Sequence, residues 1–303
     1  IFDAQVLPAR PFSAADNGAA CRADVTAVLD LIAYHPTVGP FISRQLIQRL
    51  VKSNPSGAYV QRVAQVFNNN GASVRGDLAA VVRAILLDPE ARASVVRAAG
   101  SGKVKEPLLK LTAFWRAFDV VAPASRNEPI CTLVNPTTCT GSPVVVPYIP
   151  MGIASPERNY VQRPLGAISV FNFYEPDFQQ PGQVANASLF SPEFQILNEV
   201  TTATMANDLR TRAFSFVGMT NPPFDRPLIE LAPLVALATT PTNPDALIEA
   251  TNQRLLNGLM SAEMRTALRG FMTHAAITGM TPVNRVAELL HMVALSPEFA
   301  VQL

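Results

Sequence analysis

The chain has 303 residues, 49% of them hydrophobic, so it is long enough and apolar enough to bury a large core. Its 24 basic and 23 acidic residues nearly cancel, and no run of lysine and arginine creates a local positive field, which excludes nucleic acid as an expected partner. The longest apolar runs, such as residues 231–238, fall well short of the roughly 20 residues that a membrane-spanning helix needs, so no membrane span is expected.

The chain begins with IFDAQVLPAR, which has neither an initiator methionine nor the charged-then-apolar pattern of a signal peptide. A start of this kind is typical of a processed chain. We therefore expect a processed or trimmed product.

Residues 1–120 are predicted to form an N-terminal helical block, because apolar residues recur there every three or four positions. Such stripes occupy residues 38–51, 60–67, 78–86 and 108–118. Beside the first stripe, a predicted solvated face carries Arg44, Gln45, Gln48 and Arg49. Guanidinium and amide donors on one face could bind a carboxylate or sulfate, so Arg44 and Gln48 are candidate ligand-binding residues. The alternative is a solvated flank, or one paired with acidic neighbours.

Five tripeptides have the chemistry of a helix start: an oxygen-bearing cap, a proline at the first helical position, and an acid at the positive end of the helix dipole. They are Asp88-Pro89-Glu90, Ser155-Pro156-Glu157, Ser191-Pro192-Glu193, Asn243-Pro244-Asp245 and Ser296-Pro297-Glu298. Each is predicted to begin a helix.

Two stretches of the chain resemble each other. A shift of 204 residues places Val60 on Met264, and a shift of 208 residues places Leu78 on Val286 and Asp88-Pro89-Glu90 on Ser296-Pro297-Glu298. This pattern indicates a duplicated helical hairpin followed by a short capped helix. The alternative is that any two amphipathic hairpins align this well.

Residues 121–190 differ from the flanking blocks, because they are rich in proline, threonine, asparagine and glycine and lack a helical stripe. SPVVVPYIP is the only part that could form a short strand. We predict an irregular excursion here, followed by a C-terminal helical block at 191–303. The predicted fold is therefore mainly α, a multi-helix orthogonal bundle in one compact unit with a long irregular Pro-rich central excursion.

The excursion contains two of the three cysteines, Cys131 and Cys139, in the loop CTLVNPTTC. We predict a disulfide between them, which requires an oxidising compartment. Two unpaired loop thiols are the alternative. Cys21 is then left over, either free or joined to a segment outside this chain.

The segment FNFYEPDFQQPG, residues 171–182, places four aromatic rings and two carboxylates in twelve positions. It could be a loop packed as a structural plug, since Asn172 and Asp177 can bond to the loop's own backbone. It could also bind sugar rings or a polymer, with Phe171 and Tyr174 stacking and Asn172, Glu175 and Asp177 fixing the orientation. Glu175 and Asp177 point the same way in an extended loop and would suit metal or paired-carboxylate chemistry only weakly.

No catalytic, zinc-binding or nucleotide-binding motif occurs in the sequence, and we predict no cofactor and no metal. The histidines His35, His274 and His291 are scattered, so we expect capping or half-buried structural roles for them.

Several segments, among them HPTVGPFISRQLIQRLVKSNPSGAYVQRVAQVF, VRGDLAAVVRAILLDPEAR, GKVKEPLLKLTAFWRAF and AISVFNFYEPDFQQPG, resemble the C-terminal half of the bacterial family catalogued as domain of unknown function 1800. The resemblance implies a secreted or periplasmic, mainly helical protein. It also implies two partners: the N-terminal remainder of the same precursor, and an alkaline-phosphatase-like secreted protein that is often encoded nearby.

These observations favour a secreted helical binding or scaffold module of the bacterial cell exterior. One alternative is an extracellular enzyme acting on a polymer or saccharide, which would use Glu175, Asp177 or Asp225 in a site shared with the missing N-terminal half. Another is a subunit that assembles with that half or with the phosphatase-like neighbour.

Overall fold

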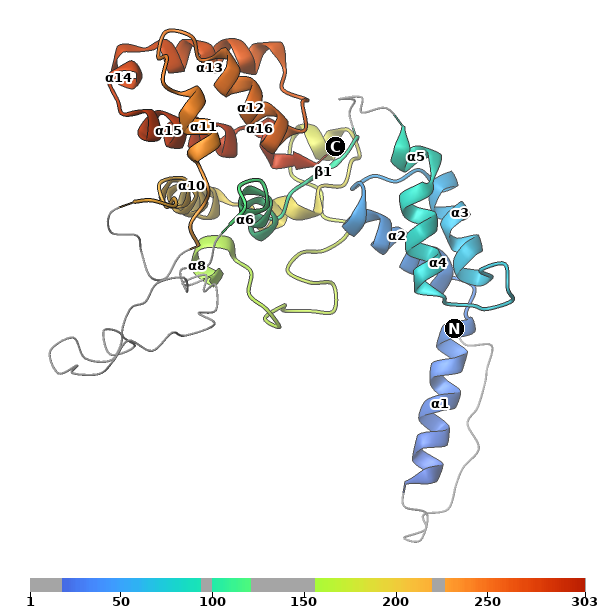
Figure 1. The fold of residues 1–303 in the computed structure, drawn as a ribbon. Helices are drawn as coiled ribbons and strands as arrows, with labels where there is room; N and C mark the ends of the chain where they lie inside the picture. Colours follow the sequence, from blue (N-terminus) through green and yellow to red (C-terminus); the bar gives the residue numbers. More distant parts are fainter. Residues whose placement is uncertain (1–17, 94–99, 121–155, 220–226, 303) are drawn as a thin grey trace, which may run out of the picture. The chain divides into compact units, whose positions relative to one another are not determined.

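The computed structural model describes residues 18–93, 100–120, 156–219 and 227–302, and they are mainly helical, as predicted (Figure 1). The elements in chain order are α1 (Ala19–Tyr34), α2 (Val38–Leu50), α3 (Gly57–Asn68), α4 (Leu78–Leu87), α5 (Pro89–Arg92), β1 (Lys103–Val104), α6 (Pro107–Arg116), α8 (Pro156–Tyr160), α9 (Gln183–Asn186), η3 (Pro192–Gln195), α10 (Glu199–Ala213), α11 (Ala232–Leu237), α12 (Asp245–Leu256), α13 (Ala262–Thr273), α14 (Ala275–Thr278), α15 (Pro282–Leu295), α16 (Pro297–Ala300) and β2 (Val301–Gln302).

The chain divides into two compact units. The first comprises Ile1–Lys103, Pro181–Ser191 and Leu303, and the second comprises Val104–Gln180 and Pro192–Gln302. The predicted blocks divide the chain differently, because the predicted N-terminal block, residues 1–120, includes α6. Phe114 of α6, and Phe118 just after this helix, pack in the core of the second unit.

In the first unit, α2, α3 and α4 enclose a core of Ile47, Tyr59, Val63, Phe67, Val81 and Ile85. Ser56 and Asp77 cap α3 and α4 by accepting backbone hydrogen bonds from Tyr59 and Ala80. The buried face of α2 is rotated from the predicted stripe: Gly39 and Ser43 are buried, whereas Phe41 is exposed. Gly39 allows this rotation, because a Cβ there would lie 2.9 Å from Asn68 Oδ1 on α3.

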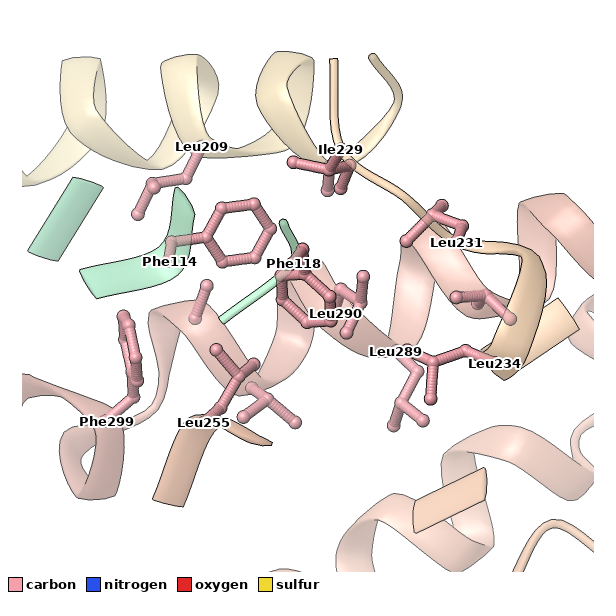
Figure 2. Close-up of a cluster of buried hydrophobic side chains, with 14 of the residues drawn as sticks. Phe114, Phe118, Leu209, Ile229, Leu231, Leu234, Leu255, Leu289, Leu290 and Phe299 are labelled. Carbon is pink, nitrogen blue, oxygen red and sulfur yellow. The ribbon is translucent and has the colours of Figure 1, made fainter. Parts of the chain in front are cut away.

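Among the described residues, the core of the second unit draws side chains from nine helices, α6, α8 and α10 to α16. Figure 2 shows Phe114 of α6, and Phe118 just after this helix, facing aliphatic residues from α10, α11, α12 and α15, with Phe299 of α16 beside them. The rings of Phe114 and Phe118 form a tilted pair, with an interplanar angle of 55° and a centroid distance of 5.3 Å, within the range of favourable aromatic contacts.

A buried polar group fixes α8 against α10 in the same unit. The hydroxyl of Tyr160 donates to Asp208, and Arg212 Nε donates to the same carboxylate at 3.1 Å. Burial, with the hydrogen bond to Asp208, raises the pKa of Tyr160. The charges of Asp208 and Arg212 compensate each other within the apolar core.

The predicted helix starts are largely confirmed. Asp88 and Ser296 are the N-caps of α5 and α16, and α8 begins at Pro156, although Ser155 lies outside the described residues. The segment starting at Pro192 forms the short 3-10 helix η3. Helix α12 begins at Asp245, one residue later than predicted. The Asp245 N–H donates to Asn243 Oδ1 at 3.4 Å.

Within the described ranges, no single helix is long and apolar enough to cross a membrane, and only α1 and α2 together, bent by 73°, pass that test of length and composition. Cys21 lies exposed on α1 as a free thiol. The predicted pair Cys131 and Cys139, the candidate strand at 142–150 and Asp225 lie outside the described residues.

Candidate functional site

The candidate ligand-binding residues of α2 do not form a joint solvent-facing clamp. Gln48 is buried, only 5% exposed, and its Nε2 donates to the Ser53 carbonyl at 3.0 Å. The prediction that it lies on the solvated face is therefore wrong. Arg44 is exposed, and its guanidinium stacks 4.7 Å from the centroid of the Phe190 ring. The rotated packing of α2 is the physical reason for this separation.

The other predicted candidates belong to a loop of the second unit, residues 163–178, which is fixed at both ends. At its start, the buried side chain of Gln162 donates from Nε2 to Glu106 Oε2 at 2.5 Å and accepts the Leu108 N–H at Oε1 at 3.1 Å. At its end, the Tyr174 hydroxyl donates to Glu106 Oε1 at 2.6 Å. One carboxylate thus joins both ends of the loop to the start of α6.

A second contact holds the end of the loop, because the Glu175 N–H donates to Gln195 Oε1 of η3 at 2.7 Å. Val161, just before the loop, has a positive φ of 55°. A β-branched residue adopts this conformation only where its surroundings impose it. Tyr160 and Gln162 on either side are both buried and hydrogen-bonded, and they impose it here.

Two tight turns shape the middle of the loop. In the first, the Gly166 N–H donates to the Arg163 carbonyl at 3.1 Å, and Leu165 has a φ of 57°. Pro164 presets the preceding position, but glycine or asparagine would be expected where Leu165 stands. In the second, the Asn172 N–H donates to the Ser169 carbonyl at 3.2 Å, and Asn172 has a φ of 82°.

These turns present three aliphatic side chains to solvent, Leu165, Ile168 and Val170, which we call the apolar tip. Leu165 is fully exposed at 107%, Val170 is 95% exposed and Ile168 is 88% exposed. No other large hydrophobic side chain in the described part of the chain exceeds 70%. Three such side chains on one hydrogen-bonded loop are typical of a contact surface for a partner.

The predicted site residues of the loop occupy different environments. Tyr174 is 3% exposed and belongs to the structural frame, whereas Phe171 and Asn172 are half-buried. Glu175 and Asp177 are exposed. Among the described residues, no group of three or more histidine, cysteine, aspartate or glutamate side chains could hold a metal ion.

The described histidines have structural contacts, as expected. His274 caps α14 by accepting the Ala276 N–H at Nδ1 at 3.2 Å, and His35 Nδ1 lies 2.8 Å from Thr37 Oγ1. His291 Nε2 lies 3.3 Å from the Ala206 carbonyl, and burial lowers the pKa of its imidazole.

The sequence pattern marks the polar and aromatic end of this loop but not the apolar tip. The segment PLGAISV has no helical or alternating apolar period, so its leucine, isoleucine and valine resembled ordinary buried residues. The one available signal was RPLG, a proline-containing turn with leucine at a position that favours glycine.

A family model described as "Protein of unknown function (DUF1800)" matches residues 6–301, nearly the whole chain. No curated protein and no solved structure matches the chain.

Proposed function

The chain belongs to the DUF1800 family of proteins of unknown function, and from that premise we propose that it is a helical binding module of the bacterial cell exterior that holds a partner protein on its apolar tip. The observation that carries the proposal is the near-complete exposure of Leu165, Ile168 and Val170 on a loop that is hydrogen-bonded at both ends. A secreted or periplasmic location rests on the family resemblance and on the predicted disulfide between Cys131 and Cys139.

The backbone conformation of Leu165 supports a role for this side chain in binding, not in folding. A non-glycine residue in the left-handed region costs roughly 1 kcal/mol, and exposing a leucine forgoes about 2 kcal/mol of burial. In the chain without a partner, the Leu165 side chain neither packs against other residues nor favours the turn conformation. A partner that covers Leu165 would supply the missing burial.

The chemistry of the exposed side chains favours a protein over a saccharide. Sugar rings are held by stacking on exposed aromatic faces, whereas Tyr174 is buried and the other rings of the 163–178 loop are half-buried. Aliphatic side chains surrounded by polar groups are typical of protein contacts. The partner we propose is the alkaline-phosphatase-like protein that the family resemblance implies.

The test is binding of the purified full chain to an alkaline-phosphatase-like protein of the kind often encoded beside family members, measured by biolayer interferometry. Replacing Leu165, Ile168 and Val170 together by asparagine removes the apolar tip and keeps a residue that tolerates a positive φ at position 165. We expect affinity to fall at least about 100-fold, since each side chain contributes about 1 kcal/mol or more when covered.

The matched control is Val200→Asn, which replaces another exposed side chain of the second unit, 69% exposed on α10. It should bind like the wild type. Equal affinity of the triple variant, or no binding by the wild-type chain, would overturn the proposal. Separate titrations with oligosaccharides and with the N-terminal portion of a family member test the two other predicted partners.

A further inference from the structure

The helices of the first unit repeat a packing pattern of the second unit. Helices α2, α3, α4 and α5 pack in the same pairs as α12, α13, α15 and α16. Helix α2 ends at Leu50 and α12 at Leu256, a difference of 206 positions, and the ends of α4 and α15 differ by 208 positions. These nearly equal offsets allow each helix of the first unit to be compared, position by position, with its equivalent in the second.

The comparison identifies a face of α4 that lacks the cover present on α15. On α4, Leu78 is 55% exposed and Leu86 is 51% exposed. At the offset of 208 positions, their equivalents on α15 are Val286 and Ala294, and both are fully buried. Helices α10 and α11 pack against α15 in the second unit. Among the described residues of the first unit, nothing covers Leu78 and Leu86 to the same extent.

Helix α1 of the same unit has an apolar stripe that is not packed against anything. Val25, Val28 and Ile32 recur at a spacing of three and four residues, which places them on one face of the helix. All three are exposed, and no residue of α1 is buried. The first unit therefore contains both an uncovered helix face and an apolar helix without a partner.

The second unit indicates how these two surfaces fit together. The offset of 206 positions, carried back along the chain, places the α1 stripe on Leu231, Leu234 and Ala238. These residues are buried, in α11 and directly on either side of it. Figure 2 shows Leu231 and Leu234 in the same core as Leu290 of α15. The stripe of α1 is thus equivalent to side chains that pack on α15, the equivalent of α4.

The connection from α1 to α2 opposes this packing within one chain. It has three residues, 35–37, whereas seven residues, 238–244, connect α11 to α12. Fully extended, these connections reach about 10 Å and about 24 Å. Arg75 also fixes the end of α1, because its Nε donates to the Ala33 carbonyl at 2.7 Å and its Nη2 to the His35 carbonyl at 3.2 Å. To reach α4 of its own chain, α1 would have to break both bonds and turn back within three residues.

We propose that two copies of the chain form a symmetric dimer by exchanging α1, so that the α1 stripe of each copy packs on the uncovered face of α4 in the other. The exchange buries both apolar surfaces of both copies. A short connection between two packed elements favours exchange over closure within one chain. The dimer uses the first unit only, so it is independent of the apolar tip and of the partner proposed for it.

The test is sedimentation velocity of the full chain from micromolar to millimolar concentration, with native mass spectrometry of the same samples. The wild type should dimerise reversibly. Val28→Glu on α1 and Leu86→Lys on α4 replace exposed side chains, so the single chain should still fold. Each change occurs twice in the dimer and should raise its dissociation constant at least about 100-fold. Val200→Glu, an exposed position on α10 of the second unit, is the control and should dimerise like the wild type.

Mixing the two variants distinguishes the exchanged dimer from other interfaces. A heterodimer of Val28→Glu with Leu86→Lys keeps one unaltered contact between α1 and α4 and brings opposite charges together in the other. The mixture should therefore form a heterodimer under conditions where each variant alone is monomeric. An interface between two α1 helices would be insensitive to Leu86→Lys, and one between two α4 helices would be insensitive to Val28→Glu.

Three results would overturn the proposal: a wild type that stays monomeric, a dimer that tolerates either variant, or a mixture that forms no heterodimer. A monomeric wild type is the result expected if α1 packs on α4 of its own chain. It is also expected if a different segment of the precursor covers the face.

Discussion

Glu90 forms hydrogen bonds with Ser56, the residue before helix α3 and 34 positions earlier in the chain. Its Oε1 accepts the backbone N–H of Ser56 at 3.1 Å, and its Oε2 accepts the Ser56 hydroxyl at 2.5 Å. Ser56 is the N-cap of α3, and its own oxygen accepts the Tyr59 N–H at 3.1 Å. This is the chemistry of a capping box, with the acid supplied by the short helix α5 instead of by α3 itself.

The same relationship recurs in the second unit. Glu298 of α16 accepts the N–H of Ser261 at 3.0 Å and its hydroxyl, and the Ser261 oxygen accepts the Met264 N–H at 3.1 Å. Ser261 is the N-cap of α13. Two helices with the same cap, each closed by a glutamate of a later capped short helix, support the predicted internal duplication.

Removing the carboxylate should destabilise the first unit. Glu90→Gln leaves one acceptor oxygen for two donors of Ser56 and removes the ion pair with Lys52, so we expect a loss of about 1–2 kcal/mol in the free energy of unfolding, measured in urea. Glu157→Gln, which breaks an exposed ion pair with Arg163, should leave the stability nearly unchanged, because exposed ion pairs contribute little. Equal effects of the two variants would show that the Glu90 cap contributes nothing special.

The register of the duplication shows what the sequence could and could not specify. Helix α3 (Gly57–Asn68) and helix α13 (Ala262–Thr273) differ by 205 positions at both ends, whereas matching apolar residues gave 204. An amphipathic stripe tolerates a one-residue slip, because its apolar positions alternate between three and four apart. The serine caps fix the register, and their role depends on Glu90 and Glu298, which lie far along the chain.

Acid should weaken the first unit through Asp88. Arg62 donates to both Asp88 oxygens, at 2.7 and 2.8 Å, and these bonds outweigh burial and lower the pKa of the carboxyl. Because the pKa is lower in the folded than in the unfolded chain, this stabilisation is complete above the ordinary aspartate pKa near 4 and is lost as the pH falls through the folded value. The difference in unfolding free energy between the wild type and Asp88→Asn should therefore shrink from pH 6 to pH 3. A constant difference would contradict this.

Raising the pH above 8 should stabilise the second unit through Lys105, whose pKa is lowered to about 8. Between pH 8 and the ordinary lysine value near 10.4, the unfolded chain binds more protons than the folded chain, so stability rises with pH. The buried hydroxyl of Tyr59, with its pKa raised to about 12, reverses the trend only above pH 10. Urea unfolding at pH 7.5 and 9.5 should show the rise in the wild type and a smaller one in Lys105→Met. The same slope in both would exclude this effect of Lys105.

Loss of the Tyr174 hydroxyl should loosen the 163–178 loop. Tyr174→Phe removes the donor to Glu106 Oε1 and leaves the ring in place, which should cost about 1–2 kcal/mol of stability. Hydrogen exchange of the Glu175 amide, which is bonded to Gln195, should speed up as the loop end opens. Unchanged exchange and stability would mean that Gln162 alone holds the loop.

The candidate site was only partly accessible from the sequence. FNFYEPDF marks an unusual loop, but the bond between Tyr174 and Glu106 joins residues 68 positions apart, and no local pattern encodes such a pairing. The polar spacing of α2 suggested a clamp that includes Gln48, and close packing at Gly39 turned that residue inward. Helix starts were predictable because a cap, a proline and an acid act within a few residues of one another.

Leu165→Gly should stabilise the fold and weaken partner binding at the same time. The fully exposed leucine has a φ of 57°, so glycine relieves strain and loses no packing. After subtracting the greater freedom of glycine in the unfolded chain, we expect a net gain of up to about 0.5 kcal/mol in urea unfolding. Leu165→Ala is the control: it removes the side chain but keeps the strain, so it should weaken binding without the stability gain. A loss of stability in Leu165→Gly would show that the leucine is packed in solution, and the apolar tip would then not be a free surface.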